Sequence, residues 1–355
     1  MTKTEELVQA EIDISIDPGF GSFKSVWVSP EGLRVVVIPS VVGVGQTDLG
    51  LLSLGELGRR RRKAIPDRVA YDGVSYLVGE NVARFTRSVQ RMDFLRLSDG
   101  PELRALLYAA LYRLLGDERE HRVNAMVGLP VEVLADREQA KATLRALRSW
   151  VIGEHQFTVN DAAVTLSVND IRLMAQPAGA FFAWGLNDQG KWIRGKSNLK
   201  APVAVCDVGF NTLDLFVVEG GEPVARFTGG DTAGMRRAAE LLTASVRGEH
   251  GIELSLHEAD ALMRQRQPRL YTSQGEANVR PLAVQAQDTA AAGVVTFIER
   301  RWGNGKQFAH LLFTGGGAAA LEKRLLQQYP HGVVLPDAVT ANAVGLARYA
   351  ARVFK

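Results

Sequence analysis

The sequence predicts an α/β fold built from two related halves. The main observation is a short pattern, D-x-G-F-x-[S/T], which the chain of 355 residues uses twice, at Asp17–Ser22 and at Asp207–Thr212. All four matching residues recur at one fixed offset of 190 positions, from 17 to 207. A chain of this length also favours two domains or one large bilobed unit. We therefore expect a duplicated architecture with one copy of the pattern in each half.

Strand-like segments flank each copy of the pattern. Isoleucines alternate from Ile12 to Ile16 before the first copy, and the apolar run Val203–Cys206 precedes the second. Lys24–Val28 and Leu213–Val218 follow the two copies and also read as strands. Each copy is therefore predicted to be a tight hairpin tip with a carboxylate on its entry side. The glycines suit such turns because they allow positive φ and close backbone approach.

A phosphate-binding interpretation explains why the aspartate and the hydroxyl residue recur along with the glycine. Backbone N–H groups in a Gly-rich turn form an anion-binding concavity. Ser22 and Thr212 can donate to phosphate oxygens, and a carboxylate can hold Mg²⁺ through its water ligands. The alternative is two ordinary hairpins with Asp and Gly in their turns. Recurrence of all four residues in register favours a clamp that holds one polyphosphate from both sides.

Composition narrows the function classes. Cys206 is the one cysteine, so no intrachain disulfide is possible, and none of the six histidines has metal-ligand spacing with another His or Cys. No apolar run reaches the 18 residues or so of a membrane span. The segment Met1–Glu11 is polar and acidic, unlike a secretory signal, and we expect a cytoplasmic protein without membrane contact. A net charge of +3 does not by itself indicate nucleic-acid binding.

The segment Gly43–Lys63 has two features of note. It is rich in Gly and Leu but contains no G-x-G-x-x-G between a strand and a helix, which argues against a dinucleotide site. It ends in five consecutive cations, Arg59–Lys63. These could form an electrostatic patch for DNA, an acidic partner or a neighbouring subunit, or they could belong to a solvated loop.

The remaining elements follow from periodicity and capping signals. Leucines at helical spacing predict a helix over Pro101–Leu115, and Asp136 with Gln139 predicts the start of another that reaches Trp150. Gly345, inside the last helix, predicts close packing against another element. We also expect a hairpin around Asp72-Gly73, a strand over Val123–Leu129 and two strand-like runs within Val159–Met174. Further helices are expected with small residues opening one at Gln176–Ala180, after Gly229–Thr232 to about Arg247, over Pro281–Trp302, over Ala319–Tyr329 and from Pro336-Asp337 onward. A capping box is expected at Ser255 and Glu258, and a surface loop over Gln265–Asn278.

Three segments together resemble the actin, sugar-kinase and chaperone ATPase superfamily. The two hairpins are similar to its phosphate 1 and phosphate 2 loops, and Leu311–Ala318 is similar to its adenosine loop. Within that superfamily, Val78–Ala83 and Gly128-Leu129-Pro130 resemble the bacterial and archaeal ParM-like proteins of plasmid segregation. The resemblance extends from about Ile12 to the C-terminus.

The resemblance implies a fold and a domain division. It implies the duplicated actin-like (ribonuclease H-like) fold, with two lobes, a mixed five-stranded sheet in each, and a nucleotide cleft between them. Domain I would take residues 1–175 plus 336–355, with a variable insertion at about 40–100. Domain II would take residues 176–335.

The resemblance also implies a Mg-ATP or Mg-ADP site with named roles. Asp17 and Asp207 would hold Mg²⁺ through water, and with Gln176, at the position that orients the attacking water, they form the catalytic set. The alternative for Gln176 is a polar residue at a helix start. The expected nucleotide-binding residues are Gly19, Phe20, Gly21, Ser22, Lys24, Gly209, Phe210, Asn211, Thr212, Gly230, Asp231, Arg236, Arg237, Glu240, Gly315, Gly316 and Gly317. For Arg236, Arg237 and Glu240 the alternative is an exposed charged helix face.

Three functional classes share such a site. The ParM-like resemblance implies an ATPase that assembles into filaments, in DNA or plasmid segregation or cytoskeletal positioning, with itself as partner and with a DNA-binding adaptor protein or DNA as further partners. The alternatives are an actin-fold scaffold ATPase that does not polymerise and a small-molecule kinase. A kinase usually needs a catalytic carboxylate at an open substrate site, for which the sequence offers no clear candidate. The Leu-rich segment Gly43–Lys63 is the predicted part of the filament contact.

Overall fold

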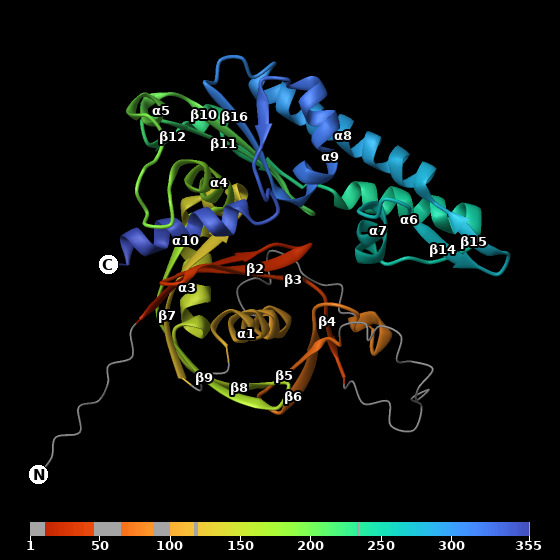
Figure 1. The fold of residues 1–355 in the computed structure, drawn as a ribbon, viewed down its shortest axis with the longest axis horizontal. Coiled ribbons are helices and arrows are strands. Elements are labelled where there is room, and N and C mark those ends of the chain that lie inside the picture. Colours follow the sequence, from red (N-terminus) through yellow and green to blue (C-terminus); the bar gives the residue numbers. More distant parts are fainter. Residues whose placement is uncertain (1–10, 46–64, 88–99, 117–119, 233, 355) are drawn as a thin grey trace, which may run out of the picture.

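The computed structural model describes residues 11–45, 65–87, 100–116, 120–232 and 234–354, and it has two lobes (Figure 1). The first lobe contains a nine-stranded sheet in the order β3-β2-β1-β7-β9-β8-β5-β6-β4. Its strands are β1 (Ile12–Pro18), β2 (Ser22–Ser29), β3 (Gly32–Pro39), β4 (Val42–Val44), β5 (Asp67–Tyr71), β6 (Val74–Val78), β7 (Glu120–Leu129), β8 (Gly153–Val159) and β9 (Ala162–Ala175).

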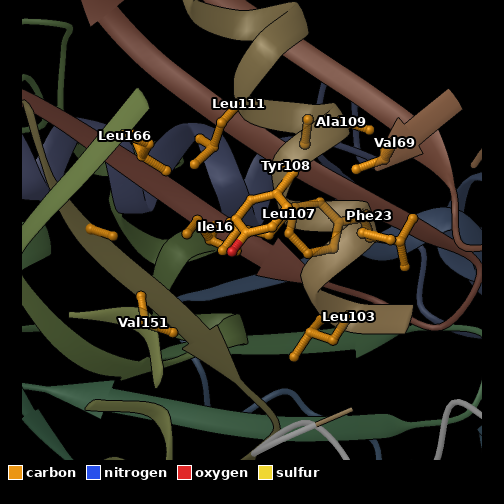
Figure 2. Packing of buried hydrophobic residues seen from close by; sticks show 14 of the residues in the cluster. Ile16, Phe23, Val69, Leu103, Leu107, Tyr108, Ala109, Leu111, Val151 and Leu166 are labelled. Carbon is orange, nitrogen blue, oxygen red and sulfur yellow. The ribbon is translucent and has the colours of Figure 1, made fainter. Parts of the chain in front are cut away.

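The sheet of the first lobe curls around one helix, α1 (Pro101–Leu115), as Figure 1 shows. Ten of its fifteen residues are buried, which explains its run of leucines and alanines. In Figure 2, Leu103, Leu107 and Tyr108 of α1 lie in one cluster with Ile16 and Phe23 of the first hairpin. The core of this lobe therefore packs directly beneath the strands that carry the first D-x-G-F pattern. The other helical segments of this lobe are η3 (Val82–Arg84), α2 (Val131–Ala135) and α3 (Arg137–Val151).

The second lobe contains a six-stranded sheet in the order β12-β11-β10-β16-β17, with β13 also paired to β11. Its main core lies between this sheet and the long helices that are inserted, in sequence, between its strands. The strands are β10 (Val203–Val208), β11 (Leu213–Glu219), β12 (Glu222–Pro223), β13 (Gly229–Asp231), β16 (His310–Thr314) and β17 (Gly332–Val334), with a separate hairpin of β14 (Arg269–Thr272) and β15 (Gly275–Asn278). The helical segments are α5 (Lys196–Lys200), η5 (Ala225–Phe227), α6 (Arg236–His250), α7 (Leu256–Met263), α8 (Arg280–Trp302) and α9 (Gly315–Gln328).

The two sheets repeat one plan, which confirms the predicted duplicated actin-like fold. β3-β2-β1-β7-β9 of the first lobe corresponds to β12-β11-β10-β16-β17 of the second, with the same parallel and antiparallel pairings between β1, β2 and β7 and between β10, β11 and β16. The prediction of five strands per lobe was too low. In the first sheet, β8 pairs with β9 as an antiparallel hairpin, and β5, β6 and β4 continue the sheet beyond β8. In the second sheet, β13 adds a strand beside β11.

Two helices lie between the sheets, α4 (Gln176–Gly185) and α10 (Ala341–Val353). They approach so closely that a Cβ atom on Gly345 would collide with the Gly179 carbonyl, and one on Gly179 with the Asn342 carbonyl. The close packing predicted at Gly345 and at the small residues of Gln176–Ala180 is confirmed. Ala343 and Ala347 of α10 pack on the first lobe, and Ala178 and Phe181 of α4 pack on the second. That packing agrees with the predicted domain division, which stays a prediction.

Several local predictions are confirmed and one is wrong. Asp136 caps α3 by accepting from the Gln139 N–H, and the capping box of Ser255 and Glu258 begins α7. The Asp72-Gly73 turn joins β5 to β6, with positive φ at both residues. The segment Gln265–Asn278 is not simply a loop, because it forms the β14–β15 hairpin. None of the described helices combines the length and the apolar character needed to cross a membrane.

Candidate functional site

A cavity of about 930 Å³ lies between the two lobes, and both D-x-G-F hairpins line it. The fold brings fourteen of the predicted site residues to this cavity, although they come from four separate segments of the chain. They are Asp17, Gly19, Phe20, Gly21, Ser22, Lys24, Gln176, Asp207, Gly209, Phe210, Asn211, Thr212, Gly315 and Gly316.

Asp17, the next-to-last residue of strand β1, lines the cavity with 2% of its surface exposed. One carboxylate oxygen, Oδ2, accepts from Lys24 Nζ at 3.1 Å, and the other, Oδ1, accepts from Gln176 Nε2 at 2.7 Å. Lys24 is the residue opposite Asp17 in the antiparallel β1–β2 register. The hairpin geometry therefore places a cation beside this buried carboxylate, and the first residue of α4 holds it from the other side.

Asp207 takes the same position in the second lobe, at the end of β10, with 5% of its surface exposed. Its Oδ2 accepts from Asn342 Nδ2 at 2.6 Å. Burial, and next the charge of Asp17, raise the pKa of Asp207 to about 6, against the opposing effects of the Asn342 hydrogen bond and the Lys24 charge. The charge of Asp17 thus acts across the interlobe boundary and disfavours the ionisation of Asp207.

An amide side chain on an interlobe helix holds each of these carboxylates. Gln176 is the first residue of α4 and Asn342 the second of α10, and each stands three residues before the glycine through which the two helices pack. Asn342 also accepts from the buried Thr314 hydroxyl at 3.4 Å. Our sequence reading did not assign Asn342 to the site. The signal that could have found it is the shared spacing of amide, two residues and glycine in both helices.

The backbone of both hairpin tips is fixed by local hydrogen bonds. In the first tip, the Gly19 N–H donates to the Asp17 carbonyl, and the Ser40 hydroxyl donates to the Gly19 carbonyl at 2.5 Å. In the second tip, the Gly209 N–H donates to the Thr212 carbonyl at 2.8 Å. A Cβ atom on Gly21 would lie 3.3 Å from Cβ of Phe210, so the two tips meet each other. The pattern thus forms one composite surface from two lobes.

The glycines at the start of α9 bring the backbone up to the carboxylate of the second hairpin. Gly315 has φ of 90°, and a Cβ atom there would collide with the Asp207 carboxylate and the Val208 carbonyl. Arg264 lies against Gly316 and donates to its carbonyl oxygen at 3.3 Å, while Asp260 holds the guanidinium. Gly317 does not line the cavity, because it packs on Val208 and Met235 behind it.

Five further predicted residues do not reach the cavity. Arg236 and Glu240 form an exposed ion pair at 2.8 Å on α6, as their alternative interpretation described, and Arg237 is exposed on the same helix. Gly230 and Asp231 lie on β13, where Gly230 faces Asp214 and Glu132. The α6 N-terminus is used differently: its first N–H groups, on Met235 and Arg236, donate to the Gly209 and Phe210 carbonyls and support the second hairpin tip.

Two walls of the cavity were not predicted. On the second lobe, α7 and the residues directly before and after it supply one wall, and His257 there stacks on Phe210 with ring centroids 5.7 Å apart. Burial lowers the pKa of His257, which favours its neutral form. On the first lobe, the segment after β6 supplies the facing wall. The residues are Ser255, His257, Glu258, Asp260, Ala261 and Arg264 on one side, and Gly79, Glu80, Asn81, Val82, Ala83 and Arg84 on the other.

One more carboxylate is buried close behind the cavity. Asp214 is fully buried on β11 and pairs with Asp207 in the β10–β11 register, where the first lobe has Lys24. Burial, and next the charge of Asp207, raise the pKa of Asp214 to about 8, although the Val131 N–H and the Thr212 hydroxyl oppose the shift. The two halves are therefore not equivalent at this position: a lysine in one corresponds to a buried acid in the other.

The donor set suits a hydrated divalent cation. Within the described parts of the chain, no three His, Cys, Asp or Glu side chains gather as a metal cluster. Asp17 and Asp207 still present two buried carboxylates in one cavity, and a bound cation would offset the Asp17 charge that, next to burial, raises the pKa of Asp207. Mg²⁺ keeps several waters and binds through one or two carboxylates plus phosphate oxygens, which matches a pair rather than a full protein cage.

Family models match most of the chain. A model of the actin-like protein N-terminal domain matches residues 15–179, and a model of the archaeal actin homologue MreB-like C-terminal domain matches residues 205–327. The chain belongs to the actin-like proteins. The first match contains the first hairpin and Gln176, and the second contains the second hairpin and the glycines at the start of α9. No curated protein matches the sequence of this actin-like protein.

Solved structures of similar fold cover this actin-like protein almost completely. A 15-stranded ParM filament from Clostridium botulinum has a TM-score of 0.77 and 20% identity, over 97% of this chain and all of that one. A non-polymerisable quadruple mutant of pCBH ParM has a TM-score of 0.76 and 20% identity, over 97% and 100%. The archaeal actin homolog Ta0583 in complex with ADP has a TM-score of 0.71 and 18% identity, over 96% and 99%. The TM-scores establish a shared fold, and at sequence identities of 18–20% the similarity establishes no more than that.

Proposed function

We propose that this actin-like protein binds Mg-ATP in the interlobe cavity, hydrolyses it, and uses the nucleotide to control assembly into filaments. The observation that carries the proposal is the pair of buried carboxylates, Asp17 and Asp207, which line one cavity from two lobes and interact electrostatically. Each is positioned by an amide from an interlobe helix. A nucleotide there would contact both lobes at once, so its binding could favour one lobe arrangement over another.

In this proposal the hairpin tips bind the phosphates. The backbone of Gly19–Ser22 and Gly209–Thr212 supplies N–H donors, and Lys24 supplies a positive charge. Mg²⁺, held through water by Asp17 and Asp207, would supply charge neutralisation for the phosphates. Gln176 donates to Asp17 through its NH₂ group, and its amide oxygen would accept a hydrogen bond from the attacking water and so orient it. Catalysis would then rest on positioning and electrostatics rather than on a covalent intermediate.

Assembly is the finer part of the proposal. Solved structures with a similar fold include a ParM filament and an Alp12 filament. A head-to-tail contact that does not close produces a filament rather than a ring. Self-association, a DNA-binding adaptor and a segregation role would follow from the same likeness. The Leu-rich segment Gly43–Lys63, including Leu49, Leu51, Leu52, Leu54 and the Arg59–Lys63 cations, falls almost entirely outside the described residues, so its predicted part in the contact stays a prediction.

Calorimetric titration with Mg-ATP tests the binding site. We expect Asp17→Asn and Asp207→Asn each to weaken Mg-ATP binding by about tenfold or more, which corresponds to about 1.4 kcal/mol. Both substitutions are isosteric, and their thermal unfolding should stay close to wild type. Glu31→Gln, at the exposed β2–β3 turn, is the control. Wild-type affinity in both site variants would contradict the carboxylate pair, whereas no binding to the wild type would contradict the nucleotide site altogether.

A further inference from the structure

The start of α2 is the point where the first lobe inserts into the second. Val131, its first residue, is 4% exposed and belongs to an apolar cluster with Val203, Val205, Phe216 and Leu312 of the second sheet. Val218 of the same sheet, three residues of α4, and Leu335 and Ala341 just before and at the start of α10 complete the buried cluster. A residue that follows the end of β7 in the first lobe is therefore surrounded by side chains of the second lobe and of the interlobe layer.

A buried hydrogen bond accompanies this apolar contact. The Val131 N–H donates to Oδ1 of Asp214 on β11 at 2.9 Å, between residues 83 positions apart. Asp214 is 0% exposed, and its second oxygen, Oδ2, has no hydrogen-bond partner in the described structure. Burying a carboxyl oxygen without a hydrogen-bond partner costs folding free energy, so the other contacts of this group should have a role that offsets the cost. The geometry therefore calls for an explanation beyond packing.

The position of Asp214 in the hairpin links this contact to the site. Asp214 lies two residues after Thr212, the hydroxyl residue of the second D-x-G-F pattern, and opposite Asp207 in the β10–β11 register. Gly230 of β13 leaves just enough room beside it, because a Cβ atom there would lie 3.0 Å from Asp214 Oδ1 and 2.7 Å from the Glu132 side chain. Both ends of the interaction are thus held: the carboxyl by the phosphate-binding hairpin, and the N–H by the first lobe.

We infer that Asp214 is an interlobe positioning residue, which couples the second hairpin tip to the spacing of the two lobes through the Val131 N–H. It touches neither phosphate nor metal in this role. Displacement of the tip Gly209–Thr212 would move β11 and hence α2, and displacement of the lobes would move the tip. The coupling to nucleotide rests on the proposed function, but the hydrogen bond and its effect on lobe spacing do not.

Two substitutions separate the hydrogen bond from the charge. Asp214→Asn retains an acceptor for the Val131 N–H, whereas Asp214→Leu keeps a similar volume without one. Glu219→Leu, at the exposed end of the same strand, is the matched control. Amide exchange of the segment around Val131 is measured in each, together with the interlobe distance distribution between spin labels on Lys141→Cys and Ser273→Cys. Both label sites are exposed, and the buried Cys206 stays unlabelled.

We expect Asp214→Leu to accelerate exchange of the Val131 amide by roughly tenfold and to broaden the distance distribution in the absence of nucleotide. Asp214→Asn and Glu219→Leu should retain wild-type protection and distances. Wild-type exchange and distances in Asp214→Leu would overturn the inference, as would equal effects of Asn and Leu, which would show that the acceptor for the Val131 N–H is not what fixes the lobe spacing. These readouts need no nucleotide, so a wild type that fails to bind Mg-ATP would contradict the proposed function and leave this inference standing.

Discussion

Gln176 lies where an orienting residue of the proposed reaction should lie, at the N-terminus of α4 and on the cavity wall. Its hydrogen bond to Asp17 gives it a second, structural role. We predict that Gln176→Ala binds Mg-ATP within a few-fold of wild type and hydrolyses it at least tenfold more slowly, because an orienting group acts on the attacking water. Titration calorimetry combined with phosphate release measures both quantities. A loss of affinity with unchanged turnover would make Gln176 a binding residue instead.

His155 predicts how stability responds to acid. Its Nε2 lies 2.7 Å from the Val151 carbonyl and its Nδ1 lies 2.9 Å from the Tyr108 hydroxyl, an arrangement that the neutral ring satisfies with one donor and one acceptor. Burial lowers the pKa of His155, so the unfolded chain takes up this proton more readily than the folded protein. The stability contributed by the neutral ring is therefore present at pH 7 and is lost as the pH falls below about 6.5.

We expect the urea midpoint of the wild type to fall between pH 7 and pH 5, and His155→Gln to show a smaller fall over the same interval. Chemical denaturation at several pH values in that range measures the effect. His331→Gln, at an exposed site before β17, is the control and should follow the wild type. If the urea midpoint of His155→Gln falls between pH 7 and pH 5 as much as that of the wild type, other groups cause the loss of stability in acid.

At the scale of elements, the contact between α4 and α10 holds in place the two amide side chains, Gln176 and Asn342, that donate to the hairpin carboxylates. A Cβ atom on Gly345 would overlap the backbone of Gly179 and Ala183, so we predict that Gly345→Ala destabilises the protein by about 1–3 kcal/mol. Gly293 offers a matched control inside α8, because nothing lies within 4 Å of an added Cβ atom. Gly293→Ala should stabilise by roughly 0.5–1 kcal/mol. Denaturant unfolding compares the two, and equal effects would contradict the close helix contact.

The elements also show which features a sequence can predict. The hairpins around Asp17 and Asp207 were predictable because turn chemistry, strand alternation and the repeated hydroxyl all lie within a few residues. Asn342 on α10 and Arg264 just after α7 reach the site only through tertiary packing. For Asn342 the one sequence signal is the amide-to-glycine spacing that it shares with the distant Gln176, and Arg264 has no such signal. The hairpin of β14 and β15 was missed because its strands are short, polar and partly exposed, with Tyr271 86% exposed. Arg236 and Glu240 were placed by resemblance, and their own ion pair shows an exposed helix face.

At the scale of the whole molecule, the lobes meet through α4, α10, the hairpin tips and Val131. Each of these contacts lies between the cavity and the other lobe, so a ligand in the cavity could change the relative position of the two sheets. A nucleotide-controlled change of shape requires such contacts. The scaffold alternative uses the same cavity and differs only in whether the lobe arrangement favoured by nucleotide presents a head-to-tail contact. A kinase would instead need a substrate beside the phosphates, and a screen of sugars and small acids for turnover faster than hydrolysis would reveal it.

Sedimentation of the wild-type protein with and without Mg-ATP, over a series of protein and salt concentrations, tests the central claim most directly. We predict that the protein pellets with Mg-ATP and remains in the supernatant without nucleotide, and that Asp207→Asn stays in the supernatant at nucleotide concentrations that pellet the wild type. Electron microscopy of the pellet should show filaments. A wild type that binds Mg-ATP in calorimetry and yet never pellets, at any protein or salt concentration, would contradict nucleotide-controlled assembly and leave a non-polymerising ATPase.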